Sequence, residues 1–265
     1  MARTPPSALA PALLALALLL GGCATARDTA AHSSSSLAQG VAAAGRRTPG
    51  RPNAAGTTAH AVLAAANPVP ALEPPPIRRW PIPYGPARRG QMAAYSLRHY
   101  GEDTYVLSNP KVIVEHYTET ATAQEAFNTF APDVPDSEFH ELPNTCAHFL
   151  VEPSGRIDQL VPLTLRCRHT TGLNWTAFGI ENVGFSDRQI LDDGAQLRAS
   201  LRLTRWLRCR YGIALKNVIG HNESLSSPFH RDRVPAFQQQ THSDFNHADM
   251  HVYRVKLARI PCPVA

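Results

Sequence analysis

The sequence predicts an α/β protein in which helices flank a central mixed β-sheet. Short apolar segments alternate with amphipathic ones in the order strand, helix, strand pair, strand, helix, strand. Elements in this order pack as one sheet with helices laid against it. Because the alternation starts where an Ala-, Pro- and Ser-rich composition ends, we expect one folded domain at residues 79–265.

The residues before this domain have the features of an exported, tethered chain. Residues 1–22 combine a short basic start with the apolar run Ala8–Leu20, which is the layout of a signal peptide. The run ends in a Gly-Gly-Cys sequence that resembles a bacterial lipobox, and it leaves two alternatives, lipidation of Cys23 or plain secretion. Residues 23–78 predict a flexible tether with a short helix at Thr58–Ala66. We therefore expect either a membrane-anchored lipoprotein or a protein secreted into the cell envelope.

Charge and cysteine content narrow the class of protein further. The net charge of +5 comes without a long Lys/Arg run or a basic patch interleaved with aromatic residues, so we expect no nucleic-acid partner. If Cys23 is lipidated, four cysteines remain, an even number that suits an oxidising compartment. Four cysteines allow three pairings, and the sequence leaves the choice open. The absence of a CxxC pair argues against a cysteine-based zinc ribbon.

The first half of the domain predicts a helix, a strand, a second helix and a hairpin. A short helix is expected at Gln91–Tyr100, and the β-branched run Lys111–Glu115 predicts a buried strand. Apolar residues at helical spacing predict a helix at Thr122–Phe130. Two apolar strands around a Pro-Ser-Gly turn predict a hairpin at residues 147–162, because Gly155 takes a positive φ at little cost.

The second half of the domain predicts two strands and two helices. Phe178–Gly184 and Asn217–Gly220 are short apolar runs typical of strands. Asp192–Tyr211 is amphipathic, begins with a capping aspartate and is followed by Gly212, so we expect a helix there. A final helix is expected at Asp249–Arg259.

Three of the predicted strands end in a side chain that can bind a metal or accept a proton. These side chains are His116, Glu181 and His221, and a loop at Thr241–Asp244 supplies further candidates. Strand ends at one edge of a sheet meet in space. Two neutral imidazoles and a carboxylate form a zinc site with one position open for water, and another carboxylate nearby can take that water's proton.

These residues resemble those of a known family, the zinc-dependent N-acetylmuramoyl-L-alanine amidases of the phage-lysozyme-like (type-2) and peptidoglycan-recognition kind. The resemblance runs from about Lys111 to Asp249 and rests on five segments in the same order. The segments are the first-ligand strand at 112–118, the hairpin at 147–161, Arg168–Asn174, the strand that ends at Glu181 and the strand that ends at His221.

The resemblance implies both a reaction and a metal. His116 and His221 would bind Zn²⁺, and Glu181 would be the general base that activates a zinc-bound water. The substrate would be peptidoglycan, a glycan strand with stem peptides, cleaved at the amide between N-acetylmuramic acid and L-alanine, and the enzyme is expected to be a monomer. The alternative is a non-catalytic peptidoglycan-binding lipoprotein of the same fold.

The third ligand is where this sequence departs from the family. The family usually places it in a Lys-x-Asp-Pro-Gly segment or uses a cysteine, and no such lysine is present here. His242-Ser243-Asp244 has the same spacing, which would make Asp244 the third ligand and His242 the group that steadies the oxyanion. His247-Ala248-Asp249 has identical spacing, so Asp249 is the competing ligand.

The resemblance also implies residues that contact the substrate. His169, Asn174 and Tyr117 would line the groove, although His169 and Asn174 have the alternative of only ordering the loop before the Glu181 strand. Among the pairings that the sequence leaves open is a bridge between Cys167 and Cys209 beside the site.

Overall fold

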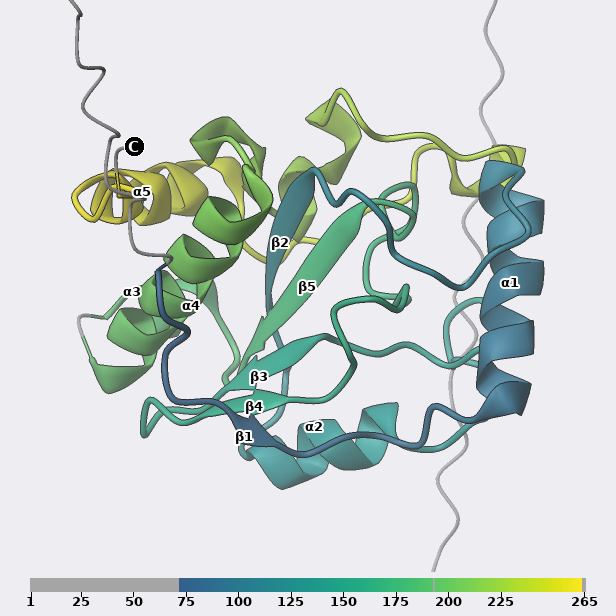
Figure 1. The fold of residues 1–265 in the computed structure, drawn as a ribbon, viewed down its shortest axis with the longest axis horizontal. Coiled ribbons are helices and arrows are strands. Elements are labelled where there is room, and N and C mark those ends of the chain that lie inside the picture. The colour runs from purple at the N-terminus through teal and green to yellow at the C-terminus, as the bar shows by residue number, and fades with distance from the viewer. Residues whose placement is uncertain (1–71, 193, 264–265) are drawn as a thin grey trace, which may run out of the picture. The chain divides into compact units, whose positions relative to one another are not determined.

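The computed structural model describes residues 72–192 and 194–263 (Figure 1). The predicted signal peptide, the lipobox at Cys23, the tether up to residue 71 and the helix at Thr58–Ala66 lie outside the described residues. Leu72 and Ile77, which fall within the predicted tether, pack against the core of the domain. Among the described helices, none has the length and apolar character needed to cross a bilayer.

The centre of the domain is a six-stranded mixed sheet with the order β1-β4-β3-β5-β2-β6. The strands are β1 (Arg78–Arg79), β2 (Val112–Tyr117), β3 (Phe149–Val151), β4 (Ile157–Gln159), β5 (Ala177–Asn182) and β6 (Val218–Gly220). The pair β3 and β4 is the predicted antiparallel hairpin, and Gly155 in its turn has a φ of 83°. The other neighbours pair in parallel, so the predicted mixed α/β sheet is confirmed.

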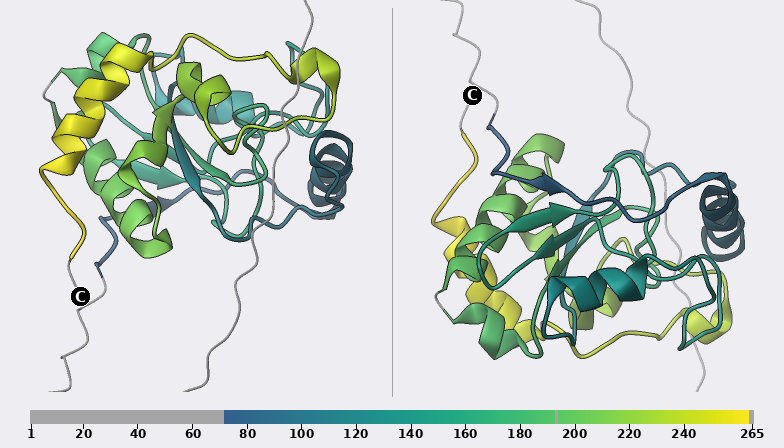
Figure 2. Two further views of the ribbon diagram at one scale, coloured as in Figure 1. Left: turned by 90° about the horizontal axis from the view of Figure 1, so that it is seen from above. Right: turned by 90° about the horizontal axis from the view of Figure 1, so that it is seen from below.

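Five α-helices surround the sheet, and α3, α4 and α5 form a layer on one face while α2 lies on the other (Figures 1 and 2). The helices are α1 (Pro86–Tyr100), α2 (Ala123–Phe130), α3 (Asp187–Leu191), α4 (Ala195–Tyr211) and α5 (His247–Ala258). Three short 3₁₀ turns follow α4, at Leu215–Asn217, His221–Ser226 and Pro235–Phe237.

The helix boundaries differ most from the sequence predictions at the starts of α1 and α4, and α5 begins two residues before the predicted Asp249. Helix α1 begins five residues before the predicted start at Gln91, because Pro86 at its first position has the φ that a helix start needs. Helix α4 starts after Gly194 rather than at a capping aspartate, and α3 precedes it as a separate helix. Gly212 ends α4 in a left-handed conformation with φ 64°, as predicted.

Alternating side chains of the central strands enter two separate hydrophobic clusters. Ile113 of β2 and Phe178 of β5 pack with α4 and α5 on one face. On the opposite face, Leu150 of β3 packs with Ala126 and Phe130 of α2. Because successive side chains of a strand point to opposite faces, β3 contributes to both clusters, while Val112 and Val114 of β2 enter a third cluster with Ala177 of β5.

Two disulfides join Cys146 to Cys167 and Cys209 to Cys262. Of the pairings that the sequence left open, those that join Cys167 to Cys209 are therefore excluded. Cys146 and Cys167 are buried together in the cluster on the α2 side of the sheet. Cys209 lies in α4, on the other face of the sheet, where it meets the chain that follows α5.

Candidate active site

Two neighbouring parallel strands bring His116 and Glu181 side by side. The register of β2 and β5 places His116 directly opposite Glu181. In β2, Ile113 and Glu115 face the helix layer, so His116 points to the other face. His221 follows β6, the other neighbour of β2, and begins a 3₁₀ turn. The sheet thus delivers all three side chains to one edge.

His116, His221 and Asp244 form a buried cluster whose candidate ligand atoms all lie within 4.8 Å of one another. Nδ1 of His116 is 2.9 Å from Oδ2 of Asp244, and Nδ1 of His221 is 3.3 Å from Oδ1 of the same carboxylate. Asp249, the competing third ligand, is outside this cluster. It lies in the first turn of α5, where its carboxylate accepts a hydrogen bond from Asn246 at 2.6 Å.

The pKa values of the three side chains indicate which charge each of them carries. Burial lowers the pKa of His221 to about 4, so this imidazole is neutral. Burial opposes the ionisation of Asp244, but hydrogen bonds from His116 and His221 outweigh it and hold the pKa of that carboxyl below its usual range. Burial also lowers the pKa of His116, yet the carboxylates of Glu181 and Asp244 together raise it. The carboxylates of Glu181 and Asp244 thus favour a positive charge near His116.

The residues present fit a zinc ion. Two imidazole nitrogens and one carboxylate oxygen are a donor set of catalytic zinc sites with three protein ligands. Nε2 of His221 and Oε2 of Glu181 are buried and have no hydrogen-bond partner among the described residues. Such unpaired polar atoms are costly unless a ligand or water satisfies them. His116, His221 and Asp244 are by themselves enough to supply the three protein ligands of such a site.

Glu181 has the environment of a general base. Burial raises the pKa of its carboxyl to about 7, although the neighbouring His116 lowers it. A carboxylate with a pKa near neutrality can accept a proton from water and later return it. The side chain is 8% exposed, and it lines the cavity that also reaches the three clustered residues.

The cavity over the cluster has a volume of about 520 Å³. One wall comes from α2 and the loop after it, and the opposite wall comes from the segment 241–244. Its acidic lining residues are Glu119, Asp136, Glu138, Glu181 and Asp244, and no lysine or arginine lines it.

A comparison with known protein families supplies the decisive observation. The model of the N-acetylmuramoyl-L-alanine amidase family (Amidase_2) matches residues 107–242, just over half of the chain. The chain belongs to the N-acetylmuramoyl-L-alanine amidase family. The matched range contains His116, Glu181 and His221, and it ends two residues before Asp244. No curated protein matches the chain.

Solved structures of amidases are similar to this chain at low identity. The endolysin amidase LysCS from Clostridium intestinale is 18% identical, with a TM-score of 0.44 over 70% of this chain and 97% of that one. AmiD from E. coli, solved with anhydro-N-acetylmuramic acid-L-Ala-D-gamma-Glu-L-Lys, is 25% identical, with a TM-score of 0.34 over 44% of this chain and 49% of its own.

In this amidase-family chain, His169 lies next to His116, on the side of its Nε2 atom. Nδ1 of His169 is 3.2 Å from Nε2 of His116, and Nε2 of His169 is 3.4 Å from the carbonyl oxygen of Ala177. When Nδ1 of His116 binds a metal, its proton sits on Nε2, which then donates to His169. The ring fits only because Gly179 has no side chain, since a Cβ there would lie 2.6 Å from it. His169 is thus placed to orient His116, a role that neither sequence alternative contained.

Asn174 is 1% exposed, and its side chain holds the loop together. Its Oδ1 accepts hydrogen bonds from the backbone nitrogens of His169 and Thr170, at 2.9 and 2.8 Å. Its Nδ2 donates to the hydroxyl of Tyr95 at 3.3 Å. The structure therefore shows Asn174 in the loop-ordering role that the sequence left open as the alternative to substrate contact.

Tyr117 and His242 both line the cavity. The ring of His242 stacks on that of His221 with a centroid distance of 4.6 Å, and its Nε2 is 3.1 Å from Oε2 of Glu138. Tyr117 is half-buried at the end of β2, with its ring 6.5 Å from that of Phe245. Both side chains can therefore reach a molecule bound over the cluster.

The buried carboxylate of Glu115, on the helix side of the sheet, stabilises the strands that carry the site. Glu115 accepts hydrogen bonds from Thr204, Ser200 and Tyr253 of the helix layer, at 2.6, 3.2 and 2.9 Å. Asn182 of β5 donates to Glu115 at 3.1 Å and to the carbonyl oxygen of His116 at 3.0 Å. This network ties the two strands together at the point where His116 and Glu181 pair. The sequence shows Glu115 only as one polar residue in an apolar run.

Proposed function

We propose that this chain hydrolyses the amide bond between N-acetylmuramic acid and L-alanine in peptidoglycan, with Zn²⁺ held by His116, His221 and Asp244. The observation that carries the proposal is the meeting of these three side chains beside Glu181, because His116, Glu181 and His221 lie within the range matched by the amidase family and Asp244 lies two residues after it. When bound, the zinc would polarise the scissile carbonyl and lower the pKa of the attacking water.

The residues of the chain supply the proton transfers. Glu181 accepts a proton from the water as its oxygen attacks the lactyl carbonyl carbon. His242, across the cavity, donates a hydrogen bond to the oxyanion that forms. The C–N bond then breaks, Glu181 returns the proton to the leaving amine of L-alanine, and a carboxylate remains on the muramic acid.

The proposed substrate is a glycan strand or fragment that carries a stem peptide. AmiD, a protein of similar sequence in part, was solved with a muropeptide of this class. The cavity of about 520 Å³ has room for the residues on both sides of one amide bond, and Tyr117 lies on its wall. His169 lines the same cavity and also supports His116, while Asn174 acts on this substrate through the shape of the loop.

Export and lipidation complete the proposal. The apolar run Ala8–Leu20 and Cys23 support a lipoprotein that acts in the cell envelope, with plain secretion as the alternative. Incorporation of radiolabelled palmitate into the parent chain, lost in Cys23→Ser, tests this. Absence of label from the parent chain would leave plain secretion.

The activity is tested by incubating the zinc-loaded protein with purified sacculi. Release of free stem peptides, detected by mass spectrometry, is the expected result, and Glu181→Gln is expected to bind zinc without releasing peptides. If the parent protein binds sacculi and contains zinc but releases nothing, it is a non-catalytic peptidoglycan-binding protein, and the amidase proposal fails.

A further inference from the structure

The outward side of α4 is strongly basic. The helix contains five arginines and no acidic residue. Arg198, Arg202 and Arg205 are spaced four and three residues apart, which places them along one side of the helix. Arg198 and Arg202 are exposed, and Arg205 is half-buried where its Nε donates to the carbonyl oxygen of Pro261 at 2.9 Å. This row of arginines lies opposite the buried side of α4, so it faces away from the sheet.

Helix α5 extends this surface with apolar as well as basic side chains. It packs beside α4, and the hydroxyl of Tyr253 lies 2.9 Å from the hydroxyls of Ser200 and Thr204. On its outward side Val252 and Val255 are each 42% exposed, and Arg259 follows one turn later. Apolar side chains beside arginines are typical of surfaces that rest in the headgroup region of a bilayer.

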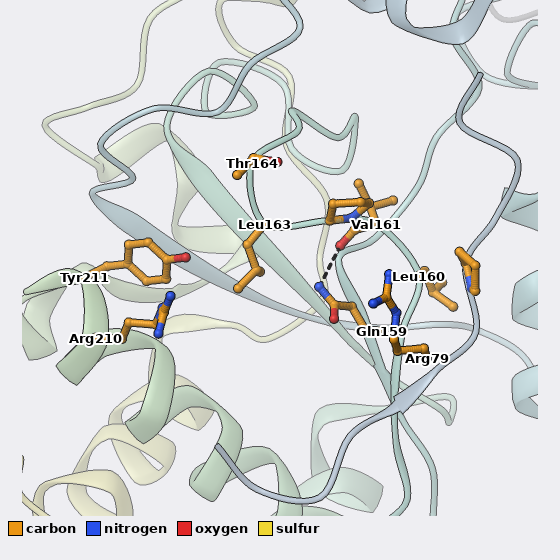
Figure 3. A pocket seen from close by; sticks show the side chains of 10 residues that line it. Arg79, Gln159, Leu160, Val161, Leu163, Thr164, Arg210 and Tyr211 are labelled. Atoms are coloured by element: carbon orange, nitrogen blue, oxygen red, sulfur yellow. Dashed lines mark hydrogen bonds between the residues drawn. The ribbon is translucent and has the colours of Figure 1, made fainter. Parts of the chain in front are cut away.

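A separate basic cavity lies between the last turn of α4, β1 and the segment 159–164. It has a volume of about 310 Å³ and is lined by Arg79 and Arg210 but by no acidic residue (Figure 3). Leu163 gives it an apolar wall, and Tyr211 lies next to Arg210 (Figure 3). Guanidinium groups bind phosphate oxygens, and an apolar wall suits the glycerol and acyl carbons next to them.

The position of the chain's N-terminal segment agrees with this surface. The described chain begins at Leu72, which packs against the hydrophobic cluster under α4 and α5, and both views place this start beside α4 (Figures 1 and 2). The described chain therefore enters the domain beside the arginine row of α4. The cavity over the metal cluster opens on the other face of the sheet, so a bilayer against α4 leaves it accessible.

We infer that the outward side of α4 and α5, with Arg198, Arg202, Val252, Val255 and Arg259, docks on an anionic phospholipid bilayer. Each arginine close to such a surface strengthens binding by about fivefold, or about 1 kcal/mol. Docking would hold the domain on the membrane with its substrate cavity turned toward the wall. The inference is independent of catalysis, because none of these residues lines the cavity over the metal cluster.

The test is vesicle co-sedimentation with zinc-loaded protein of residues 24–265, which lacks the apolar run and Cys23. This chain retains every described element, because the sheet and both hydrophobic clusters lie within residues 72–263. We expect binding to vesicles that contain phosphatidylglycerol, none to phosphatidylcholine alone, and loss of binding as salt is raised. The double substitution Arg198→Gln with Arg202→Gln is expected to weaken binding about 25-fold.

The matched control removes the same charge at the other end of the domain. Arg89 and Arg233 are exposed, on and beside α1, and replacing both by Gln is expected to change vesicle binding less than about twofold. Hydrolysis of a soluble muropeptide should be unchanged in both variants. If the α4 double variant does not fold, Arg202→Gln alone is expected to weaken binding about fivefold.

Two results would overturn the inference. One is equal vesicle binding by the parent protein and the α4 variant. The other is binding of soluble polyphosphate, dependent on Arg202, by a protein that ignores anionic vesicles, which would assign the surface to a phosphate polymer instead of a bilayer.

Discussion

The cavity over the metal cluster and the outward side of α4 carry opposite charge. The cavity over the metal cluster is lined by acidic residues without a lysine or arginine, whereas α4 on the other face has five arginines and no acidic residue. The net charge of +5 is therefore not spread evenly over the molecule. An arginine near Asp244 would compete with a metal cation for its carboxylate, so the separation protects the metal site.

One strand, β2, contributes side chains to both faces of the sheet. In β2, Ile113 and Glu115 face the helix layer, while Val114 and His116 face the other side. The alternation of side chains along a strand is enough to place a structural carboxylate and a candidate metal ligand one residue apart. Glu115 and Glu181, both buried, therefore serve different ends: one joins strands to helices, and the other lines the cavity over the metal cluster.

The largest expected effect comes from the third ligand on the acidic face. Asp244→Ala removes one of three clustered donors, so we expect loss of bound zinc and of all measurable hydrolysis. Asp249→Ala is the matched control, because Asp249 contacts Asn246 at the start of α5. Zinc content by mass spectrometry decides between them, and normal zinc content in Asp244→Ala would remove Asp244 from the site.

The next largest effect on hydrolysis is expected from Glu181, the proposed general base. Glu181→Gln keeps the size of the side chain but cannot accept the proton from water, so kcat is expected to fall by about a thousandfold. Zinc content should equal that of the parent protein, because Glu181 is outside the ligand cluster. Turnover at the parent rate would show that another group accepts the proton.

The fold and the metal cluster were predictable because they depend on local patterns. β-branched runs that end in His116, Glu181 and His221 indicate both the strands and the edge at which they meet. The spacing within Thr241–Asp244 was enough to propose Asp244, but Asp249 has the same spacing from His247. The structure distinguishes the two, because Asp244 joins the cluster and Asp249 bonds to Asn246 at the start of α5.

The remaining features depend on contacts between distant segments. His169 and His116 are 53 residues apart, and the absent side chain at Gly179 that admits the ring leaves no periodic signal. The two disulfides follow from which face of the sheet each cysteine reaches, which the spacing of four cysteines does not encode. The two-residue strand β1 is too short to show a pattern.

A smaller effect on zinc affinity is expected from His169, which orients the imidazole of His116. His169→Ala removes one of the two hydrogen-bond partners of Nε2 of His116 and leaves the hydroxyl of Thr170, so zinc affinity is expected to fall about 10- to 100-fold. Gly179→Ala should have a similar effect, because its Cβ would displace the His169 ring. Competition with a chelator measures zinc affinity directly. Parent-like affinity in both variants would show that His169 does not orient His116.

The fourth prediction concerns pH. Burial raises the pKa of Glu181 to about 7, and the base acts only when ionised, so kcat/KM should fall as pH decreases, by about tenfold per unit below the pKa. The positive charge of zinc stabilises the carboxylate, which places the midpoint below pH 7. A pH profile of muropeptide hydrolysis measures this limb. A rate that stays constant from pH 7 down to pH 4 would contradict the assignment.

The smallest expected effect lies on the helix side of the sheet. Ser200→Ala removes one of the four donors to Glu115, and the loss is expected to lower the free energy of unfolding by about 1 kcal/mol. Hydrolysis at saturating zinc should be unchanged, because three donors still hold Glu115 and Asn182 still bonds to the carbonyl oxygen of His116. Ser154→Ala, in the exposed hairpin turn, is the control and should leave stability unchanged. Denaturant unfolding measures both. If Ser200→Ala instead lowers kcat at unchanged stability, the helix layer affects the chemistry directly, and the two faces are less separate than their charges indicate.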